Sequence, residues 1–482
     1  MSLSHAINAA KSGLQVSGLR ADIVANNVAN ATTPGYVRRS VMLSETIVGQ
    51  RSAGVHSTGI ARSADSALTS QRMMLSSDLS QANVLASTWQ TLSARLGDTA
   101  DGAGLFSKLS QFEEALQTAA TSPESKTNAN AVLDAARAIT TELNSLSALV
   151  ATQRSEADRE IADGVNVVND ALKKIETLNG QLSSMDRTTP QAAGLMDERQ
   201  RTLDTIAEYL PVQAVPRQAG TIDLVTKEGV YLLQGKARQI EFTPSSAFGP
   251  NQTVGNGALS GMSVDGIDIT PGAFSFGAVS SGLFGALFTL RDGDLPDFGR
   301  QLDTVAEDLI TRLSDDTIDP TKMPGDPGLF VDTNPGGGDG LAGRIDLNAL
   351  VDPTQGGEIW RLRDGLGATA EGPPGNTSIL TAMLGSITDT RAINANGFQG
   401  SFTASELTAT FASRTGQARI SNEAVLSSTN AQHNLVAEAE QDKTGVDVDS
   451  EMQALLLIEQ AYAANARVIE TANQMVQRLM EI

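Results

Sequence analysis

The chain contains no cysteine, which excludes a disulfide framework, a thiolate metal site and a cysteine nucleophile. Basic residues are also scarce, because 35 Lys and Arg stand against 56 Asp and Glu and give a formal net charge of −21. Such a chain has no basic field to hold phosphate groups, so neither nucleic acid nor a membrane surface is expected as a partner. Aromatic residues make up only 4% of the 482 residues. Isolated cores should therefore be weak, and we expect stability to depend partly on neighbouring chains.

Long apolar runs are absent as well. No stretch of the sequence reaches the roughly 18 apolar residues that cross a membrane. The first residues also lack the charged start and the apolar core of a cleaved signal peptide. The chain is therefore expected to be cytosolic, or exported by a route that cleaves no signal. His5, His56 and His433 are isolated in the sequence, so no metal, no cofactor and no catalytic role is expected.

Both ends of the chain carry a regular apolar pattern. Residues 3–28 and 452–480 repeat apolar side chains at alternating steps of three and four, which is typical of helices that pack against a partner helix. The alternative is that each stripe is only the buried face of a helix in a globular domain. Asn465 is the one polar position in the C-terminal stripe, and a lone polar seam residue often fixes register. The N-terminal stripe consists of Leu3, Ile7, Ala10, Leu14, Ser17, Ala21, Val24 and Val28. The C-terminal stripe consists of Leu455, Ile458, Tyr462, Asn465, Ile469, Ala472, Val476 and Leu479.

Between these ends the sequence predicts a mainly α fold with β insertions. Long antiparallel or coiled helices formed by both termini should carry one or two outer β-rich domains. Short alternating runs separated by Gly and Pro indicate a small β domain, and a stretch rich in Gly, Pro and Asp indicates an irregular insertion. The predicted domains are residues 1–62 with 430–482 (terminal helical coiled coil for polymerisation), 63–211 with 281–317 and 401–429 (long-helix bundle), 212–280 (small β domain) and 318–400 (irregular insertion).

A fourteen-residue motif follows the first stripe. It runs Asn26-Asn27-Val28-Ala29-Asn30-Ala31-Thr32-Thr33-Pro34-Gly35-Tyr36-Val37-Arg38-Arg39, in which Pro34 stops the helical spacing and Gly35 permits positive φ in a turn. The motif closely resembles the N-terminal signature of bacterial flagellar axial proteins, the family of rod, hook and hook-associated subunits. The resemblance implies functional positions at Asn26, Asn27, Asn30, Thr33, Pro34, Gly35, Tyr36 and Arg38.

Further segments resemble the same family. Residues 282–296, followed by Gln301-Leu302-Asp303, are similar to an internal helix of the hook-associated members that hook and rod subunits lack. Met196-Asp197-Glu198-Arg199-Gln200 resembles an Asp-Gln-Arg-Asp segment of those members, although its second aspartate is absent here. Residues 444–452 and 459–469 look like the closing axial motif, which hook proteins share.

The resemblance implies a non-enzymatic structural subunit at the junction between flagellar hook and filament, polymerising through its terminal helices. The implied partners are other copies of the chain in a ring or helical layer, the hook protein, and the second hook-associated junction protein. A cytosolic export chaperone is expected to cover residues 455–479, because their apolar face would otherwise drive premature assembly. The resemblance also implies an extracellular place in the flagellum, reached by export without a cleaved signal peptide.

Other interpretations stay open. The nearest is a hook or distal rod subunit of the same family, and a more distant one is a free secreted adhesin. A glycan-processing enzyme would need a carboxyl group whose pKa is shifted by burial. Asp292 and Asp294 are expected to be exposed in an Arg-Asp-Gly-Asp turn, which speaks against that role. Arg38 and Arg39 are expected either to pair with acidic residues of a neighbouring subunit or to form a solvated edge.

An acidic cluster precedes the C-terminal stripe. Asp447, Asp449 and Glu451 could offer oxygen ligands to a cation, but the segment lacks the glycine that an EF-hand loop needs at its sixth position. We therefore expect these residues to favour the N-terminal dipole of a helix. Ser450 and Gln453 are expected to form a capping box there.

Overall fold

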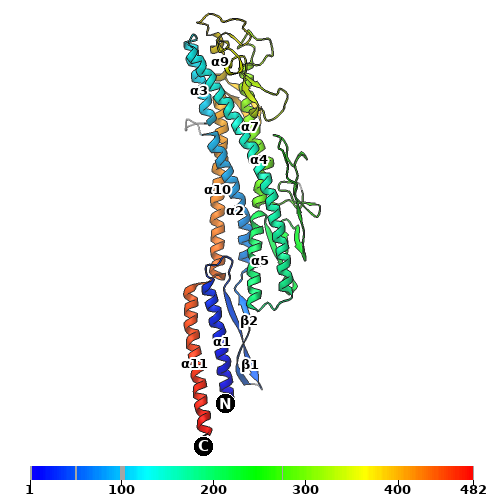
Figure 1. Cartoon of the computed structure of the whole chain (residues 1–482), viewed down its shortest axis with the longest axis vertical. Helices are drawn as coiled ribbons and strands as arrows, with labels where there is room; N and C mark the ends of the chain where they lie inside the picture. The colour runs from blue at the N-terminus through cyan, green and yellow to red at the C-terminus, as the bar shows by residue number, and fades with distance from the viewer. Residues whose placement is uncertain (1–2, 49–50, 98–103, 274, 481–482) are drawn as a thin grey trace.

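Both termini form helices that lie side by side at one end of an elongated molecule (Figure 1). The computed structural model describes residues 3–48, 51–97, 104–273 and 275–480. The described chain is mainly helical with short antiparallel sheets, so the predicted fold class is confirmed. The helices are α1 (Leu3–Ala29), α2 (Ser66–Leu96), α3 (Gly104–Thr121), α4 (Lys126–Ser183), α5 (Pro190–Tyr209), α6 (Gly282–Thr289), the π-helical turn η2 (Leu290–Asp294), α7 (Leu295–Ser314), α8 (Arg361–Asp364), α9 (Ser378–Thr388), α10 (Ala404–Thr444) and α11 (Val448–Met480). The strands are β1 (Arg39–Val48), β2 (Arg51–Arg62), β3 (Val212–Pro216), β4 (Ile222–Thr226), β5 (Tyr231–Gln234), β6 (Lys236–Ala237), β7 (Ile240–Glu241), β8 (Ser263–Val264), β9 (Ile267–Asp268), β10 (Phe330–Asp332), β11 (Ile345–Leu347), β12 (Arg391–Ala395) and β13 (Phe398–Phe402).

The spine of the helical body is α4, which is 58 residues long (Figure 1). The side chain of Ser125 caps its start by accepting the backbone N–H of Asn128. Its buried residues recur every three or four positions, so one stripe packs against neighbouring elements along its whole length. The next helix, α5, begins with Thr189 as its N-cap and Pro190 in its first turn.

Two hydrophobic cores share this spine. One combines α3, the first half of α4, α7, α9 and the start of α10. The other combines α2, the second half of α4, α5 and α6 with the strands between residues 212 and 280. In that β region, β3–β6 form a four-stranded antiparallel sheet and β7–β9 a three-stranded one. Leu224, Leu232 and Val264 are buried, so the β region shares its core with the helices.

Residues 318–400 are more ordered than the sequence predicts. They contain the paired strands β10 and β11, helix α9 and the hairpin β12–β13. Ile379, Met383 and Phe398 are buried in the same core as α3 and α7, so this region packs onto the end of the helical body. Each element is short and is bounded by Gly, Pro or Asp, so its apolar spacing is too brief to be recognised in the sequence.

The two terminal helices and one hairpin form a separate layer. Helix α1 lies between α11 and the hairpin β1–β2 (Figure 1), and we call these three elements the terminal layer. The layer meets the helical body where α1 leads into β1 and where α10 gives way to α11, and we call this junction the waist. Within the described part of the chain, helices long and apolar enough to cross a membrane are not found.

Candidate subunit-assembly site

The predicted terminal stripes meet each other in the terminal layer. Gly13 of α1 faces Asn465 of α11, and a Cβ on Gly13 would lie only 2.6 Å from Asn465 Nδ2. The polar seam residue therefore packs against the α1 backbone, where a side chain on Gly13 would leave it too little room. Tyr462 and Leu479 remain 50% and 69% exposed, so this contact leaves them largely uncovered. The buried stripe positions are Ala10, Ser17, Val24, Ile458 and Ala472. The half-buried ones are Leu3, Ile7, Leu14, Ala21, Val28, Leu455, Asn465, Ile469 and Val476.

Helix α1 has a second packing face, which lies outside the N-terminal apolar stripe. Ser12, Val16, Ile23 and Asn27 are spaced by four, seven and four residues, so they share one side of the helix. Ser12 Oγ accepts the backbone N–H of Val55 at 3.2 Å, which shows that this side faces the hairpin. Val16, Ile23 and Asn27 are all buried. Because α1 packs on two sides, its apolar residues extend beyond a single seam.

The axial motif centres on Asn27, which is fully buried. Its Nδ2 donates to the carbonyl of Arg39 at 2.9 Å and to Glu451 Oε2 at 3.1 Å. Its Oδ1 accepts the hydroxyl of Tyr36 at 2.9 Å and the backbone N–H of Arg39 at 3.1 Å. Burial raises the pKa of the Tyr36 phenol above its ordinary value, so this residue remains a hydrogen-bond donor. Asn27 thus ties the end of α1 to the start of β1 and to α11.

The remaining motif residues shape the turn that follows α1. Asn26 and Asn30 each donate Nδ2 to the carbonyl four residues earlier, at 2.8 and 2.9 Å. Thr33 Oγ1 donates to Asn30 Oδ1 at 3.3 Å, and the carbonyl of Pro34 accepts Arg201 at 3.3 Å. Gly35 has a φ of 73°, so the expectation of a positive φ there is confirmed. The motif is therefore a helix end and a turn that dock onto the waist.

Two buried carboxylates anchor the waist. Glu451 is 1% exposed and accepts Arg38 Nε at 2.6 Å. The side chain of Asp197 is 4% exposed and accepts Arg39 Nη2 at 2.8 Å and Arg62 Nε at 2.6 Å. Because Arg39 begins β1 and Arg62 ends β2, Asp197 of α5 holds both strands of the hairpin at the point where they leave the body.

These pairs bear on three points of the sequence interpretation. Arg38 and Arg39 pair within their own chain, so a neighbouring subunit is not needed to neutralise them. The carboxylate of Glu451 is occupied by Arg38 and Asn27, which argues against the cation site. Asp197 is the residue that sequence reasoning missed, and its only signal was the segment at residues 196–200.

The predicted capping box at the start of α11 is wrong. The helix begins at Val448, and Ser450 lies inside it and donates Oγ to Asp447 Oδ2 at 2.7 Å. Asp447 Oδ1 accepts the backbone N–H of Asp449 at 3.0 Å, so Asp447 is the residue that caps this helix. These hydrogen bonds also lower the pKa of the Asp447 carboxyl.

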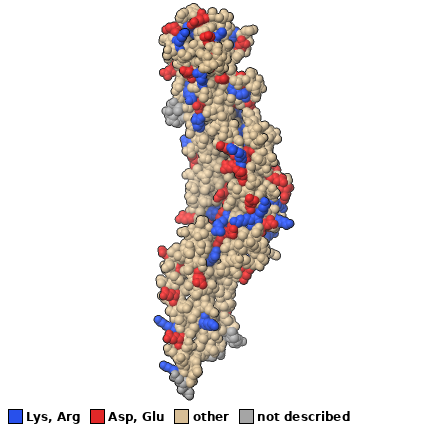
Figure 2. All heavy atoms as spheres, viewed as in Figure 1, with Lys and Arg blue, Asp and Glu red and all other residues tan. Residues whose placement is uncertain are grey.

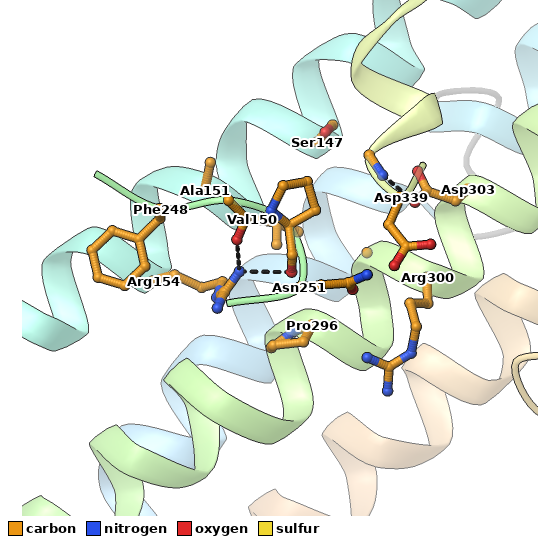
Figure 3. A pocket seen from close by; sticks show the side chains of 14 residues that line it. Ser147, Val150, Ala151, Arg154, Phe248, Asn251, Pro296, Arg300, Asp303 and Asp339 are labelled. Atoms are coloured by element: carbon orange, nitrogen blue, oxygen red, sulfur yellow. Dashed lines mark hydrogen bonds between the residues drawn. The ribbon is translucent and has the colours of Figure 1, made fainter. Parts of the chain in front are cut away.

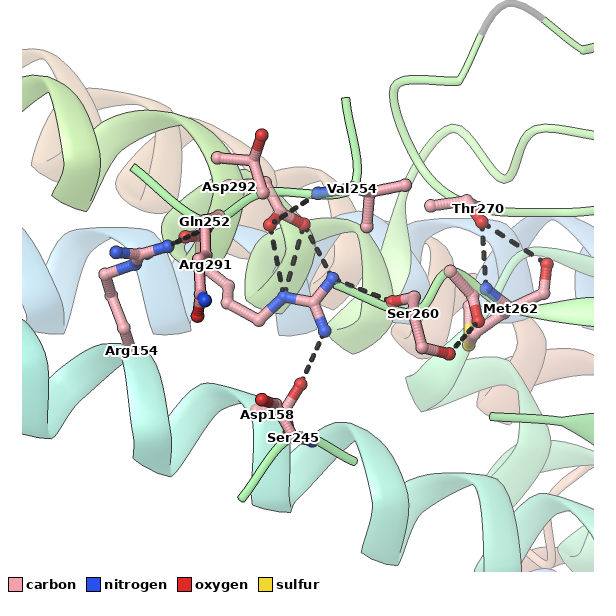
Figure 4. Close-up of polar contacts among 12 residues, drawn as sticks. Arg154, Asp158, Ser245, Gln252, Val254, Ser260, Met262, Thr270, Arg291 and Asp292 are labelled. Atoms are coloured by element: carbon pink, nitrogen blue, oxygen red, sulfur yellow. Dashed lines mark hydrogen bonds and ion pairs between the residues drawn. The ribbon is translucent and has the colours of Figure 1, made fainter. Parts of the chain in front are cut away.

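Asp292, one of the two carboxylates considered for an enzyme, lies in a largely buried network rather than in an exposed turn (Figure 4). Arg291 of the π-helical turn is fully buried and donates to Asp158 at 2.6 Å, to Asp292 at 2.8 Å and to the carbonyl of Ser260 at 3.0 Å. Asp294 accepts the indole N–H of Trp89 at 3.2 Å, and burial raises the pKa of its carboxyl. The expected exposure of Asp292 and Asp294 is therefore wrong. The network instead fastens the β region to α4.

A hollow of about 80 Å³ lies beside this network, between α4, α7 and the loop that carries Phe248 (Figure 3). Arg154 on its wall donates Nη1 to the carbonyls of Gly249 and Pro250, both at 2.9 Å. Asp303 accepts the backbone N–H of Gly340 at 2.6 Å and that of Ala342 at 2.8 Å. Arg154 and Asp303 thus hold loops in place, so the hollow is lined by groups that already have structural partners.

Family comparisons point to the flagellum. The model for the flagellar hook-associated protein FlgK helical domain matches residues 90–328. The model for the C-terminal region of the flagellar basal body rod FlgEFG protein matches residues 442–482. The model for the flagella basal body rod protein matches residues 7–36. The three matched segments include the axial motif up to Tyr36, most of the helical body and α11.

Individual relatives agree with the family matches. Flagellar hook-associated protein 1 of Salmonella typhimurium is 26% identical over 302 residues, which cover 61% of this chain and 53% of that protein. The Escherichia coli protein of the same name is 24% identical over 308 residues with the same two coverages, and the Bacillus subtilis one is 24% identical over 240 residues, 47% of each chain. The chain thus spans about half the length of the curated relatives that it matches. The solved flagellar hook junction protein FlgK of Burkholderia pseudomallei gives a TM-score of 0.44 at 18% identity, over 55% of this chain and 46% of that one.

Proposed function

Because the chain belongs to the FlgK family of flagellar hook-associated proteins, we propose that it is a structural subunit of the hook–filament junction. In this proposal the subunits polymerise through the terminal layer, and the helical body and β region lie outside it. The four-part domain division predicted from the sequence is part of the same proposal. The relatives are flagellar structural proteins, so no enzymatic activity is proposed.

The observation that carries the proposal is the amount of apolar side chain that α11 leaves exposed. Leu456, Leu457, Tyr462, Met475 and Leu479 are each between 50% and 69% exposed. Large apolar side chains grouped on one element mark an interaction surface, because leaving them in water costs about 25 cal/mol per Å² of apolar area. In a free monomer this helix would be only half covered, whereas a polymer supplies the missing neighbours.

The proposal includes four partners. The first is the chain itself, in a ring or helical layer, and the second and third are the hook protein and the second hook-associated junction protein. The fourth is an export chaperone that binds α11 over residues 455–479 before secretion, because this helix carries the exposed apolar surface. Export to the flagellum outside the cell, without a cleaved signal peptide, completes the proposal.

Complementation of a flagellated bacterium that lacks its own junction subunit tests the proposal. Cells would receive the full chain, a chain without residues 1–30, or a chain without residues 450–482, and electron microscopy would record filaments on hooks. Met323→Ser is the control, because Met323 is 73% exposed yet lies outside the terminal layer. Immunoblotting of the culture medium would separate failed export from failed docking.

We expect the full chain and the control to restore filaments, and both truncations to leave bare hooks although the protein reaches the medium. Filaments on cells that carry either truncation would show that the terminal layer is not the polymerising element. Bare hooks with the full chain, secreted as a stable monomer, would favour the adhesin interpretation.

A further inference from the structure

Helix α11 carries a second apolar stripe that does not face α1. Its members recur at steps of three and four, and all of them are exposed. At about 100° per residue, the stripe is centred about a quarter turn around the helix from seam residues such as Ile458, so α1 does not cover it. Leu457 is 64% exposed, Val468 45% and Met475 52%. We call this surface the outer stripe, and it consists of Leu457, Ala461, Ala464, Val468 and Met475, with the one polar residue Thr471.

The free face of α1 does not match the outer stripe chemically. Asn8, Lys11, Gln15 and Asp22 are exposed along α1 and are all polar. Packing this face of a neighbouring α1 onto the outer stripe would remove these polar groups from water without apolar contact in return. The partner of the outer stripe must therefore come from another element.

The hairpin offers a matching apolar surface on the other side of α1. Leu43 and Ile47 share one face of β1 and are 43% and 66% exposed, whereas Met42, 42% exposed, points to the other face of the strand. Since α1 lies between α11 and the hairpin, the outer stripe and this β1 surface are carried by elements at opposite edges of the terminal layer (Figure 1). One chain cannot bring them together, but two neighbouring copies can.

The two surfaces also stand at the same height along the layer. Gly13 of α1 faces Asn465, and a Cβ on Gly54 of β2 would collide with Ser12, the residue next to Gly13. Glu45 of β1 pairs with Val55, so it lies close to the level of Asn465. Arg467 of α11 is two residues further along.

The charged residues beside these two surfaces are also complementary. Glu45 and Arg467 are both exposed, and among the described residues neither makes an ion pair. In the helical body, by contrast, many arginines are paired with carboxylates, as the spread of adjacent charges of opposite sign in Figure 2 illustrates. An unpaired acid on one side and an unpaired base at nearly the same height on the other are complementary between copies.

Building on the proposed function, we propose that the outer stripe of α11 in one copy packs against β1 of the next copy, with Arg467 paired to Glu45. Such a contact uses a different surface on each copy, so it repeats around a ring or along a helix rather than closing a dimer. The outer stripe points about a quarter turn away from the direction of α1, so the terminal layers of neighbouring copies would meet at an angle. That angle makes the assembly curve, as a tube wall requires.

Cysteine cross-linking tests this contact with little background, because the parent chain has no cysteine. The double variant Ile47→Cys with Val468→Cys would be expressed in the junction-deficient cells, and isolated hooks and filaments would be treated with a short bismaleimide. A second pair, Leu43→Cys with Leu457→Cys, allows for an axial offset between copies. The control pairs Asn8→Cys with Val468→Cys, which places one thiol on the polar face of α1. All these positions are exposed in the single chain, so the substitutions should preserve its fold.

A ladder of dimers, trimers and higher species from at least one double variant, with monomers from the single variants and from the control, is the expected result. Dimers from Val468→Cys alone would reveal α11 packed on α11 and would overturn the proposal. Restored filaments without any ladder would overturn it too, while leaving the proposed function intact. If the parent chain failed to restore filaments, the purified double-cysteine variants would be cross-linked at high concentration instead. Only monomers in that experiment would count against the contact.

Charge reversal gives a second readout. Glu45→Arg should lower the yield of the cross-linked ladder in the double-cysteine background, and adding Arg467→Glu should restore it, because the pair is rebuilt with its signs exchanged. If Glu45→Arg alone and Glu45→Arg combined with Arg467→Glu gave equal yields of the cross-linked ladder, the ion pair would be removed from the proposal.

Discussion

Replacing Asp197 by asparagine is expected to loosen the hairpin at the waist. The carboxylate is 4% exposed and serves two arginines, whose side chains are 14% and 17% exposed. Removing one partner of a buried ion pair costs roughly 3–5 kcal/mol, and the partial exposure of Arg39 and Arg62 places the cost nearer 2–3 kcal/mol by comparison with exposed pairs. At about 1.36 kcal/mol per factor of ten, the local opening equilibrium should rise roughly 30- to 150-fold.

Native-state hydrogen exchange measures this opening residue by residue. The amide of Ile60 is suited to it, because it donates to the carbonyl of Thr188 at 2.7 Å between the hairpin and the body. Glu198→Gln is the matched control, since Glu198 is the next residue and its pair with Lys174 is exposed on both sides. That control should change exchange by less than about fivefold. An Ile60 exchange rate in Asp197→Asn within about twofold of the parent rate would refute the assignment of Asp197 as an anchor.

Three further substitutions test other parts of the structure. Glu451→Gln should speed proteolysis of the break between α10 and α11, because a buried carboxylate loses its charge beside Arg38; Asp449→Asn, at an exposed position, should leave cleavage unchanged. Gly13→Val should destabilise the α1–α11 pair, because the added side chain would collide with Asn465; urea unfolding followed by circular dichroism measures the loss. Adding Asn465→Ala should recover part of the lost stability, with a coupling energy of about 0.5–3 kcal/mol in a double-mutant cycle. Additive effects of the two substitutions would contradict the contact. Burial raises the pKa of Asp294, so the folded state disfavours its ionised form, and the contribution of Asp294 to stability falls as pH rises above the ordinary value of 3.8. Asp294→Asn should therefore gain thermal stability relative to the parent at pH 6–8 and lose that advantage near pH 3, and a difference that does not vary with pH would count against the burial.

The terminal helices are the part of the fold that the sequence specifies best. Their apolar steps of three and four predict helix over residues 3–28 and 452–480, and the structure has α1 at Leu3–Ala29 and α11 at Val448–Met480. The breaks are equally local, since Pro34 and Gly35 cannot continue a helix in the same conformation. A long periodic segment averages over many side chains, so a single polar residue such as Asn465 does not hide it.

The waist could not be predicted in the same way, because its partners are distant in the chain. Arg38 and Glu451 are 413 residues apart, and Arg39 and Asp197 are 158 residues apart. A lone carboxylate within a helix reads as a solvated position unless the fold that buries it is known. Asp292 illustrates the same limit, since the π-helical turn that aims Arg291 at it leaves no periodic signal.

The arrangement of the anchors also explains how the layer could set the position of the rest of the molecule. Asp197 holds the two ends of the hairpin, whereas Glu451 holds the first turn of α11 through Arg38. The backbone N–H of Arg38 also donates to the carbonyl of Thr444, at the end of α10, at 2.9 Å. This bond and the Asp197 pairs tie the terminal layer to the helical body at two points, which resists rotation of the layer about its long axis. If copies pack through the outer stripe and β1, the direction of each layer is fixed by its neighbours, and the waist passes that direction on to the helical body. Loosening Asp197 should then broaden the orientations of the body in electron micrographs of the junction before it abolishes assembly, because the packing surfaces of the layer remain intact.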